Sequence, residues 1–133
     1  MKLTDKYLLT IIPESTNIDK DLANRMMRFM ERHKGLGLAA NQVGEMTRLF
    51  VMNVSVPRRC FNPKILEQSK ATYKCVEGCL SYPKKIQSKD RSAYIVVEYT
   101  NQEGNRIEAD LHNLEAVVFA HELDHLNGIQ WIK

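Results

Sequence analysis

The chain has 133 residues, 44% of them hydrophobic and 26% charged, which is the balance of one soluble globular domain with no room for a second core. Its net charge is +3 and its basic residues are scattered, so the composition does not favour a nucleic-acid-binding protein. No stretch approaches the roughly 20 apolar residues of a membrane span. We therefore expect a single domain over residues 1–133.

The N-terminal segment and the cysteines indicate the cellular compartment in which the protein is expected. Charged residues within Met1–Lys6 are followed by only six residues before Pro13, which is too short for a signal peptide. Three cysteines, Cys60, Cys75 and Cys79, are an odd number with no secretion signal beside them. We expect free thiols in the cytoplasm rather than a disulfide scaffold.

The first third of the chain predicts a strand, a helix and a glycine-rich stretch. Residues 7–12 predict a short strand that Pro13 closes. Apolar residues then recur at helical spacing until Gly35, at Ile18, Leu22, Met26, Phe29 and Met30, with His33 at the helix end. Residues 35–44 hold three glycines and two alanines, so their backbone can approach a ligand or a packed neighbour closely. They lack the pattern of a phosphate-binding loop.

The rest of the chain predicts strands and one long helix. Residues 49–54 predict a buried strand with a turn at 57–59, and residues 65–68 and 71–76 suggest a strand pair. The clearest strand is 93–100, which a turn at 102–105 joins to 106–109 as a hairpin. A helix follows from Asn113 to Leu126, with Asn127 and Gly128 as its stop.

The final helix carries the pattern most typical of a chemical site. His121 and His125 lie four residues apart on one helical face, so both imidazoles can reach one metal ion, and Glu122 lies beside them. The two histidines share an apolar stripe with Leu114, Val117 and Val118, which places them on the side that faces the core. The predicted fold is α+β: antiparallel strands packed around a C-terminal metal-binding helix, with one N-terminal helix.

A third protein ligand must come from upstream, because residues 126–133 contain no His, Cys, Asp or Glu. Cys60, Cys75, Cys79, His33 and His112 are the cysteine and histidine candidates. A thiolate from Cys79 would leave a fourth position open for water, as in catalytic sites. A closed structural zinc site that also uses Cys75 is the alternative.

Three stretches, taken in order, resemble the three motifs of the peptide deformylases: residues 35–42 (GLGLAANQ), 77–81 (EGCLS) and 121–125 (HELDH). The resemblance covers nearly the whole chain. It implies an enzyme that hydrolyses the N-formyl group from formyl-methionyl nascent peptides and releases formate. It also implies one Fe²⁺ ion per chain, which Zn²⁺, Ni²⁺ or Co²⁺ can replace. Another metal-dependent amidase or peptidase with the same ligands is the alternative enzyme.

The resemblance also assigns roles to residues. Cys79, His121 and His125 would hold the metal, and Glu122 would be the acid and base. Gln42 and the backbone amide of Leu80 would bind the oxyanion. We expect the substrate contacts at Leu36, Gly37, Glu77, Leu114, Val117 and Val118.

The sequence departs from the family pattern in three places. Ala120 stands where the family often has Gln, and residues 84–86 (KKI) stand where it often has Arg. The chain stops eight residues after His125, whereas many cellular members continue into another helix, so it resembles the short virus-encoded forms. We expect a monomer in the cytoplasm (the host cytoplasm if virus-encoded), with transient ribosome proximity and no contact with nucleic acid or membrane.

Overall fold

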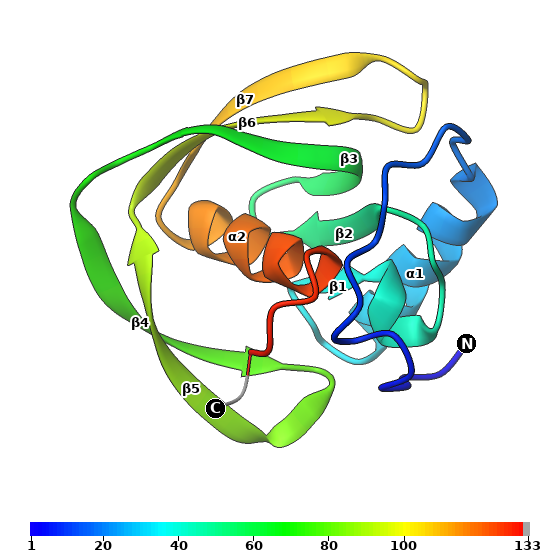
Figure 1. Ribbon diagram of the computed structural model, residues 1–133, viewed down its shortest axis with the longest axis horizontal. Helices are drawn as coiled ribbons and strands as arrows, with labels where there is room; N and C mark the ends of the chain where they lie inside the picture. Colours follow the sequence, from blue (N-terminus) through cyan, green and yellow to red (C-terminus); the bar gives the residue numbers. More distant parts are fainter. Residues whose placement is uncertain (132–133) are drawn as a thin grey trace.

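The computed structural model describes residues 1–131, so the last two residues of the predicted domain lie outside the described part (Figure 1). Its strands form two antiparallel sheets. The larger sheet has the order β1-β2-β3-β6-β7, with bounds Gly37–Ala39, Leu49–Asn53, Pro57–Gln68, Tyr94–Thr100 and Arg106–His112. The smaller sheet is a ribbon of β4 (Thr72–Cys79) and β5 (Tyr82–Ser92). The predicted α+β class is confirmed.

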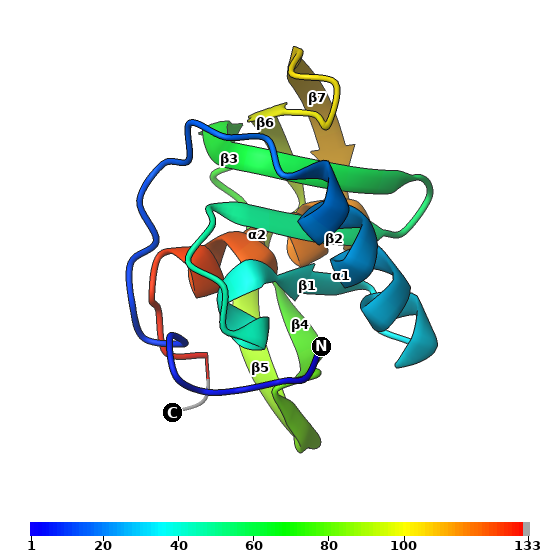
Figure 2. The same ribbon diagram turned by 90° about the vertical axis from the view of Figure 1, so that its right-hand side faces the viewer.

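Two α-helices pack against the larger sheet, α1 (Lys20–Arg32) and α2 (Leu114–Leu126), and a short 3-10 helix, η1 (Ala40–Val43), follows β1. Asp19 caps α1 by accepting from the Leu22 N–H at 3.0 Å. Figure 1 shows α2 between the larger sheet and the ribbon, and Figure 2 shows α1 beside β1 and β2. No helix within residues 1–131 is both long and apolar enough to cross a membrane.

Strand β2 explains how one sheet holds both helices. Phe50 and Met52 belong to the apolar cluster with α2, and Leu49 and Val51 belong to the cluster with α1. Successive side chains of a strand point to opposite faces, so β2 is buried on both sides. Phe50 meets Phe119 of α2 edge to face, with ring centroids 4.8 Å apart. This packing fixes α2 on the sheet and directs its other side toward the ribbon.

Several predicted elements are confirmed and others are wrong. The two helices, the strand at 49–54 and the hairpin that follows residue 93 are present. Residues 7–12 form turns and a single bridge from Ile11 to Asn127 instead of a strand, because the Ile12 N–H bonds to the end of α2. Residues 57–59 begin β3 rather than a turn. The predicted pairing of residues 65–68 with residues 71–76 is also wrong. Residues 65–68 pair with β6, and β4 pairs with β5.

Candidate active site

One cluster of metal-binding side chains lies where the ribbon meets α2. Within residues 1–131, Cys79, His121 and His125 are the one group of three such residues, and their ligand atoms all lie within 4.8 Å of one another. The His125 Nε2 atom is 3.3 Å from Cys79 Sγ and 3.1 Å from His121 Nε2. Three electron-pair donors that converge in this way suit a cation, and thiolate and imidazole are both ligands that zinc and other transition metals accept. The donor set therefore fits a metal ion.

The backbone explains why Cys79 joins the cluster and Cys75 does not. Both cysteines lie on β4, and Cys79 ends the strand at a register shift after Gly78. At about 3.3 Å per residue, four strand residues separate their Cα atoms by about 13 Å. A zinc–sulfur bond is only about 2.3 Å long, so one ion cannot bind both thiolates. The closed structural site is therefore wrong.

A buried network of charged residues fixes the His121 ring through Nδ1, the ring nitrogen that does not face the ligand cluster. Glu77 Oε1 lies 2.8 Å from His121 Nδ1, so Nδ1 donates and Nε2 is left to face the cluster. Arg91 donates to both oxygens of Glu77, at 2.7 and 3.0 Å, and to Asp124 at 2.7 Å. Burial raises the pKa of Glu77, but the bonds from His121 and Arg91 outweigh it and lower that pKa to about 2. Glu77 is therefore a fixed carboxylate that orients a ligand.

The two histidines differ in their affinity for protons when no metal is bound. Burial lowers the pKa of His121, but its bonds with Cys79 and Glu77 outweigh that effect and raise the pKa to about 10. Burial and then the charge of His121 lower the pKa of His125 to about 3. A metal competes with the His121 proton for the same Nε2 lone pair, so metal uptake releases protons.

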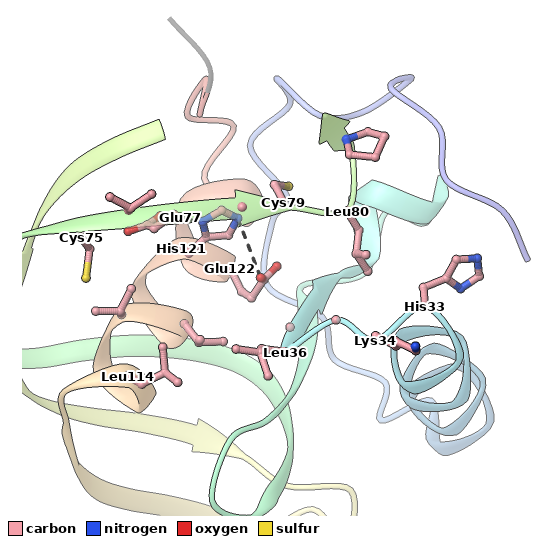
Figure 3. A pocket seen from close by; sticks show the side chains of 17 residues that line it. His33, Lys34, Leu36, Cys75, Glu77, Cys79, Leu80, Leu114, His121 and Glu122 are labelled. Atoms are coloured by element: carbon pink, nitrogen blue, oxygen red, sulfur yellow. Dashed lines mark hydrogen bonds and ion pairs between the residues drawn. The ribbon is translucent and has the colours of Figure 1, made fainter. Parts of the chain in front are cut away.

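Glu122 is a buried carboxyl group with an unused oxygen. Its side chain is 5% exposed, its Oε1 atom has no hydrogen-bond partner, and Oε2 lies 4.0 Å from His121 Nε2 (Figure 3). Burial is the main cause that raises its pKa to about 7. A carboxyl group poised near neutral pH, beside a set of metal ligands, is typical of a general acid and base.

Gln42 approaches the cluster from the other side. Its Oε1 accepts from the Ala39 N–H at 2.9 Å, which fixes which end of the amide is the donor. Its Nε2 atom donates to Ser81 Oγ at 2.9 Å and lies 3.5 Å from Cys79 Sγ. The amide N–H groups of Gln42 are therefore held at the edge of the cluster.

A cavity of about 500 Å³ opens beside these groups (Figure 3). Its lining brings together ten residues that the sequence singled out: Leu36, Gly37, Glu77, Cys79, Leu80, Leu114, Val117, Val118, His121 and Glu122. Gln42 and His125 are buried behind this lining. His33, expected at the end of the helix, caps α1 and lies at the cavity wall.

One expectation about the lining needs correction. The apolar stripe was expected to face the core throughout, yet Leu114 is 48% exposed because it begins α2 at the cavity rim. Glu77 was expected to contact substrate; it belongs to the cavity lining, and both of its oxygens accept hydrogen bonds, from Arg91 and His121. Three further residues near the site were not predicted from the sequence: Arg91, which has no motif around it, and Asp124 and Ser81, which each lie inside a motif but were given no role.

The geometry defines a class of protein. A helix that supplies two histidines and a buried carboxyl group, with a third ligand beside an open cavity, is the site of a metal-dependent hydrolase. The model of the polypeptide deformylase family matches residues 1–133. The chain belongs to this family, and it is a metal-dependent hydrolase that removes the N-formyl group from nascent peptides.

Individual relatives agree with this assignment. The peptide deformylase of Thermotoga maritima is 43% identical over 118 residues, which cover 86% of this chain and 72% of the relative. Its crystal structure superposes with a TM-score of 0.89 at 40% identity, covering 94% of this chain and 88% of that one. The deformylase of the Vibrio parahaemolyticus bacteriophage VP16T, crystallised with actinonin, has a TM-score of 0.93 at 34% identity and covers 98% and 99% of the two chains. The resemblance inferred from the three motifs is confirmed.

Gly37 leaves room for Glu122, which gives a first prediction. A Cβ atom at Gly37 would lie 2.6 Å from Glu122 Oε2 and 2.8 Å from its Cγ. We expect Gly37→Ala to keep its metal but to lose about 100-fold in turnover, because a displacement of about 1 Å costs that much. Formate release and metal content measure the two effects. Gly35→Ala is the control, because its methyl group meets mainly the flexible end of Leu80. Equal losses in both variants would contradict this explanation.

Proposed function

We propose that Cys79, His121 and His125 hold the catalytic metal and that Glu122 moves the proton. The observation that carries this assignment is the buried Glu122 carboxyl group, whose Oε1 has no partner and whose Oε2 lies 4.0 Å from His121 Nε2 in the cluster of three ligand atoms. A buried polar atom without a hydrogen-bond partner lowers the stability of the fold. Its presence at this position therefore supports a role for Glu122 in the reaction. A divalent ion bound there supplies Lewis acidity and a nucleophilic water at neutral pH.

The proton transfer, the stabilisation of the oxyanion and the orientation of His121 are each assigned to residues of the chain. Glu122 accepts the proton that the attacking water loses and delivers it to the leaving amine nitrogen as the bond from carbon to nitrogen breaks. Gln42 Nε2 donates to the formyl oxygen as that oxygen becomes negative, together with the Leu80 N–H. Glu77 keeps the His121 ring in one tautomer throughout. The products are formate and a free amino terminus.

We propose that the peptide binds as an added strand between the larger sheet and the ribbon. β1 is the terminal strand of the larger sheet, and β4 pairs on one side with β5. Both β1 and β4 contribute residues to the cavity wall. An extended peptide can pair with such strand edges, and its side chains then enter neighbouring pockets. Leu36, Leu114, Val117 and Val118 provide the apolar wall for a methionine side chain.

Formate release tests the activity directly. A formyl-Met peptide should release formate when treated with the metal-loaded protein, whereas the matching acetyl-Met peptide should react far more slowly. The two substrates have the same leaving and attacking groups. They differ in the acyl group, and the methyl group of the acetyl substrate must fit against the buried residues around the metal site. Equal rates on both peptides would favour a general amidase over a deformylase.

The choice of metal gives a second prediction. The proposed native metal is Fe²⁺, and Ni²⁺, Co²⁺ and Zn²⁺ are expected to replace it in a site with one thiolate and two imidazoles. We expect the iron form to be active but to lose activity in air as the Cys79 sulfur is oxidised, whereas the nickel and cobalt forms stay active. Activity against time, with mass spectrometry of the Cys79 peptide, checks this. Equal decay of the iron and nickel forms with unmodified Cys79 would contradict it.

The surroundings of the enzyme follow from its substrate. Because nascent chains emerge in the cytoplasm, we propose that the protein acts there as a monomer, transiently near the ribosome and without contacting nucleic acid. Sedimentation of the purified protein and co-sedimentation with ribosomes test the two parts of this proposal separately.

A further inference from the structure

The segment after α2 returns to the metal site. It runs from the end of the helix toward the ribbon (Figure 1) and brings Trp131 against the back of the ligand cluster. Trp131 is the single tryptophan of the chain and is 2% exposed. Its contacts involve two groups that the proposed mechanism depends on, His121 and Glu77.

The indole N–H of Trp131 donates to Glu77 Oε1 at 3.3 Å. The same oxygen accepts from His121 Nδ1 at 2.8 Å and from Arg91 at 3.0 Å. Arg91 approaches Glu77 from the neighbouring strand β5, and Trp131 approaches it from the segment after α2. The indole N–H therefore adds a third donor to the oxygen that orients the ligand.

The ring of Trp131 makes two aromatic contacts. It meets the His121 ring at a centroid distance of 5.4 Å and an angle of 60°, and it stacks on Tyr82 at 5.6 Å and 27°. His121 comes from α2, whereas Tyr82 begins β5 three residues after Cys79. The three rings thus connect the helix that carries two ligands with the ribbon that carries the third.

We infer that Trp131 is a positioning residue for the metal site: its N–H holds Glu77 while its ring holds His121 and Tyr82, so the ribbon and α2 keep the spacing that the metal needs. This inference rests on the proposed metal ligands. Partners outside a ligand set can change metal affinity by roughly 10- to 100-fold, and one hydrogen bond of 3.3 Å from a neutral N–H contributes no more than the low end of that range.

The test removes the N–H and keeps an aromatic ring. We expect Trp131→Phe to bind Zn²⁺ roughly 3- to 10-fold more weakly than the native chain, measured by competition with a chromophoric chelator. Tyr99→Phe is the matched control, because it also removes one hydrogen bond from an aromatic ring, the partly buried bond with Arg58 at 3.1 Å, but away from the cavity. Its Zn²⁺ affinity should change less than about 2-fold.

Three results would overturn the inference. The first is a Zn²⁺ affinity of Trp131→Phe equal to that of the native chain. The second is an equal loss of Zn²⁺ affinity in Trp131→Phe and Tyr99→Phe, since general destabilisation would then explain both losses. In the native protein, the single indole N–H gives one identifiable nitrogen-15 NMR signal, which should exchange slowly with deuterium. Exchange as fast as in free tryptophan would show that the bond to Glu77 is absent. Unchanged Zn²⁺ binding in Cys79→Ala would instead refute the proposed metal site itself.

Discussion

Replacing Glu122 with glutamine is expected to lower turnover by about 10²- to 10⁴-fold while the fold and the bound metal are retained. The amide has nearly the shape of the carboxyl group but cannot accept the proton of the attacking water. Stability should not fall, because Glu122 Oε1 has no hydrogen-bond partner to lose. Formate release, metal content and the unfolding temperature measure the three quantities on the same preparation.

Glu115→Gln is the matched control for this prediction. Glu115 lies on the same helix and pairs with Arg58 at 3.2 Å, but it does not line the cavity. The same chemical change there should alter turnover less than about 2-fold. If Glu122→Gln kept turnover within tenfold of the native enzyme, Glu122 would not be the proton acceptor.

The pH dependence of turnover follows from the same carboxyl group. Only the ionised form accepts a proton, so activity falls as the pH drops through the pKa of Glu122. Burial raises that pKa to about 7, whereas a bound cation nearby favours the carboxylate and lowers it. The acid limb of the profile is therefore expected below pH 7, and it should disappear from the residual activity of Glu122→Gln.

The sequence predicted the parts of the site that have local patterns. His121, Glu122 and His125 occupy one stretch of helix, where spacing alone determines which side chains meet. The helices followed from apolar residues at a period of 3.6, and β6 from its β-branched and aromatic residues. Contacts within one element therefore follow from its own sequence pattern.

Contacts between distant segments were predicted only where a family motif marks both of them, as for Cys79 and the two histidines of α2. Arg91 meets Glu77 and Asp124, which lie 14 and 33 positions away, and no repeated pattern marks it among the charged residues of β5. The polar sequence of β5 also concealed the strand itself, because it faces solvent for most of its length. The strand partners of β3 depend in the same way on how the whole sheet assembles.

Replacing Cys79 with alanine is expected to remove tight metal binding and, with it, nearly all activity. Its Sγ atom lies 3.3 Å from His125 Nε2, at the point where the ligand atoms converge. Because residues that only support a ligand already change metal affinity by 10- to 100-fold, loss of a ligand should cost more than about 100-fold. Metal content after dialysis and formate release at saturating metal separate lost affinity from lost chemistry.

Cys75→Ala provides the comparison, because it removes the same side chain from the same strand. Cys75 also lies beside the cavity, but the strand carries it about 13 Å from Cys79, beyond the reach of a shared ion. We expect this variant to keep its metal and most of its activity. If Cys75→Ala lost the metal as completely as Cys79→Ala, both thiolates would be ligands, the fourth position would not be open to water, and the hydrolytic site would need another explanation.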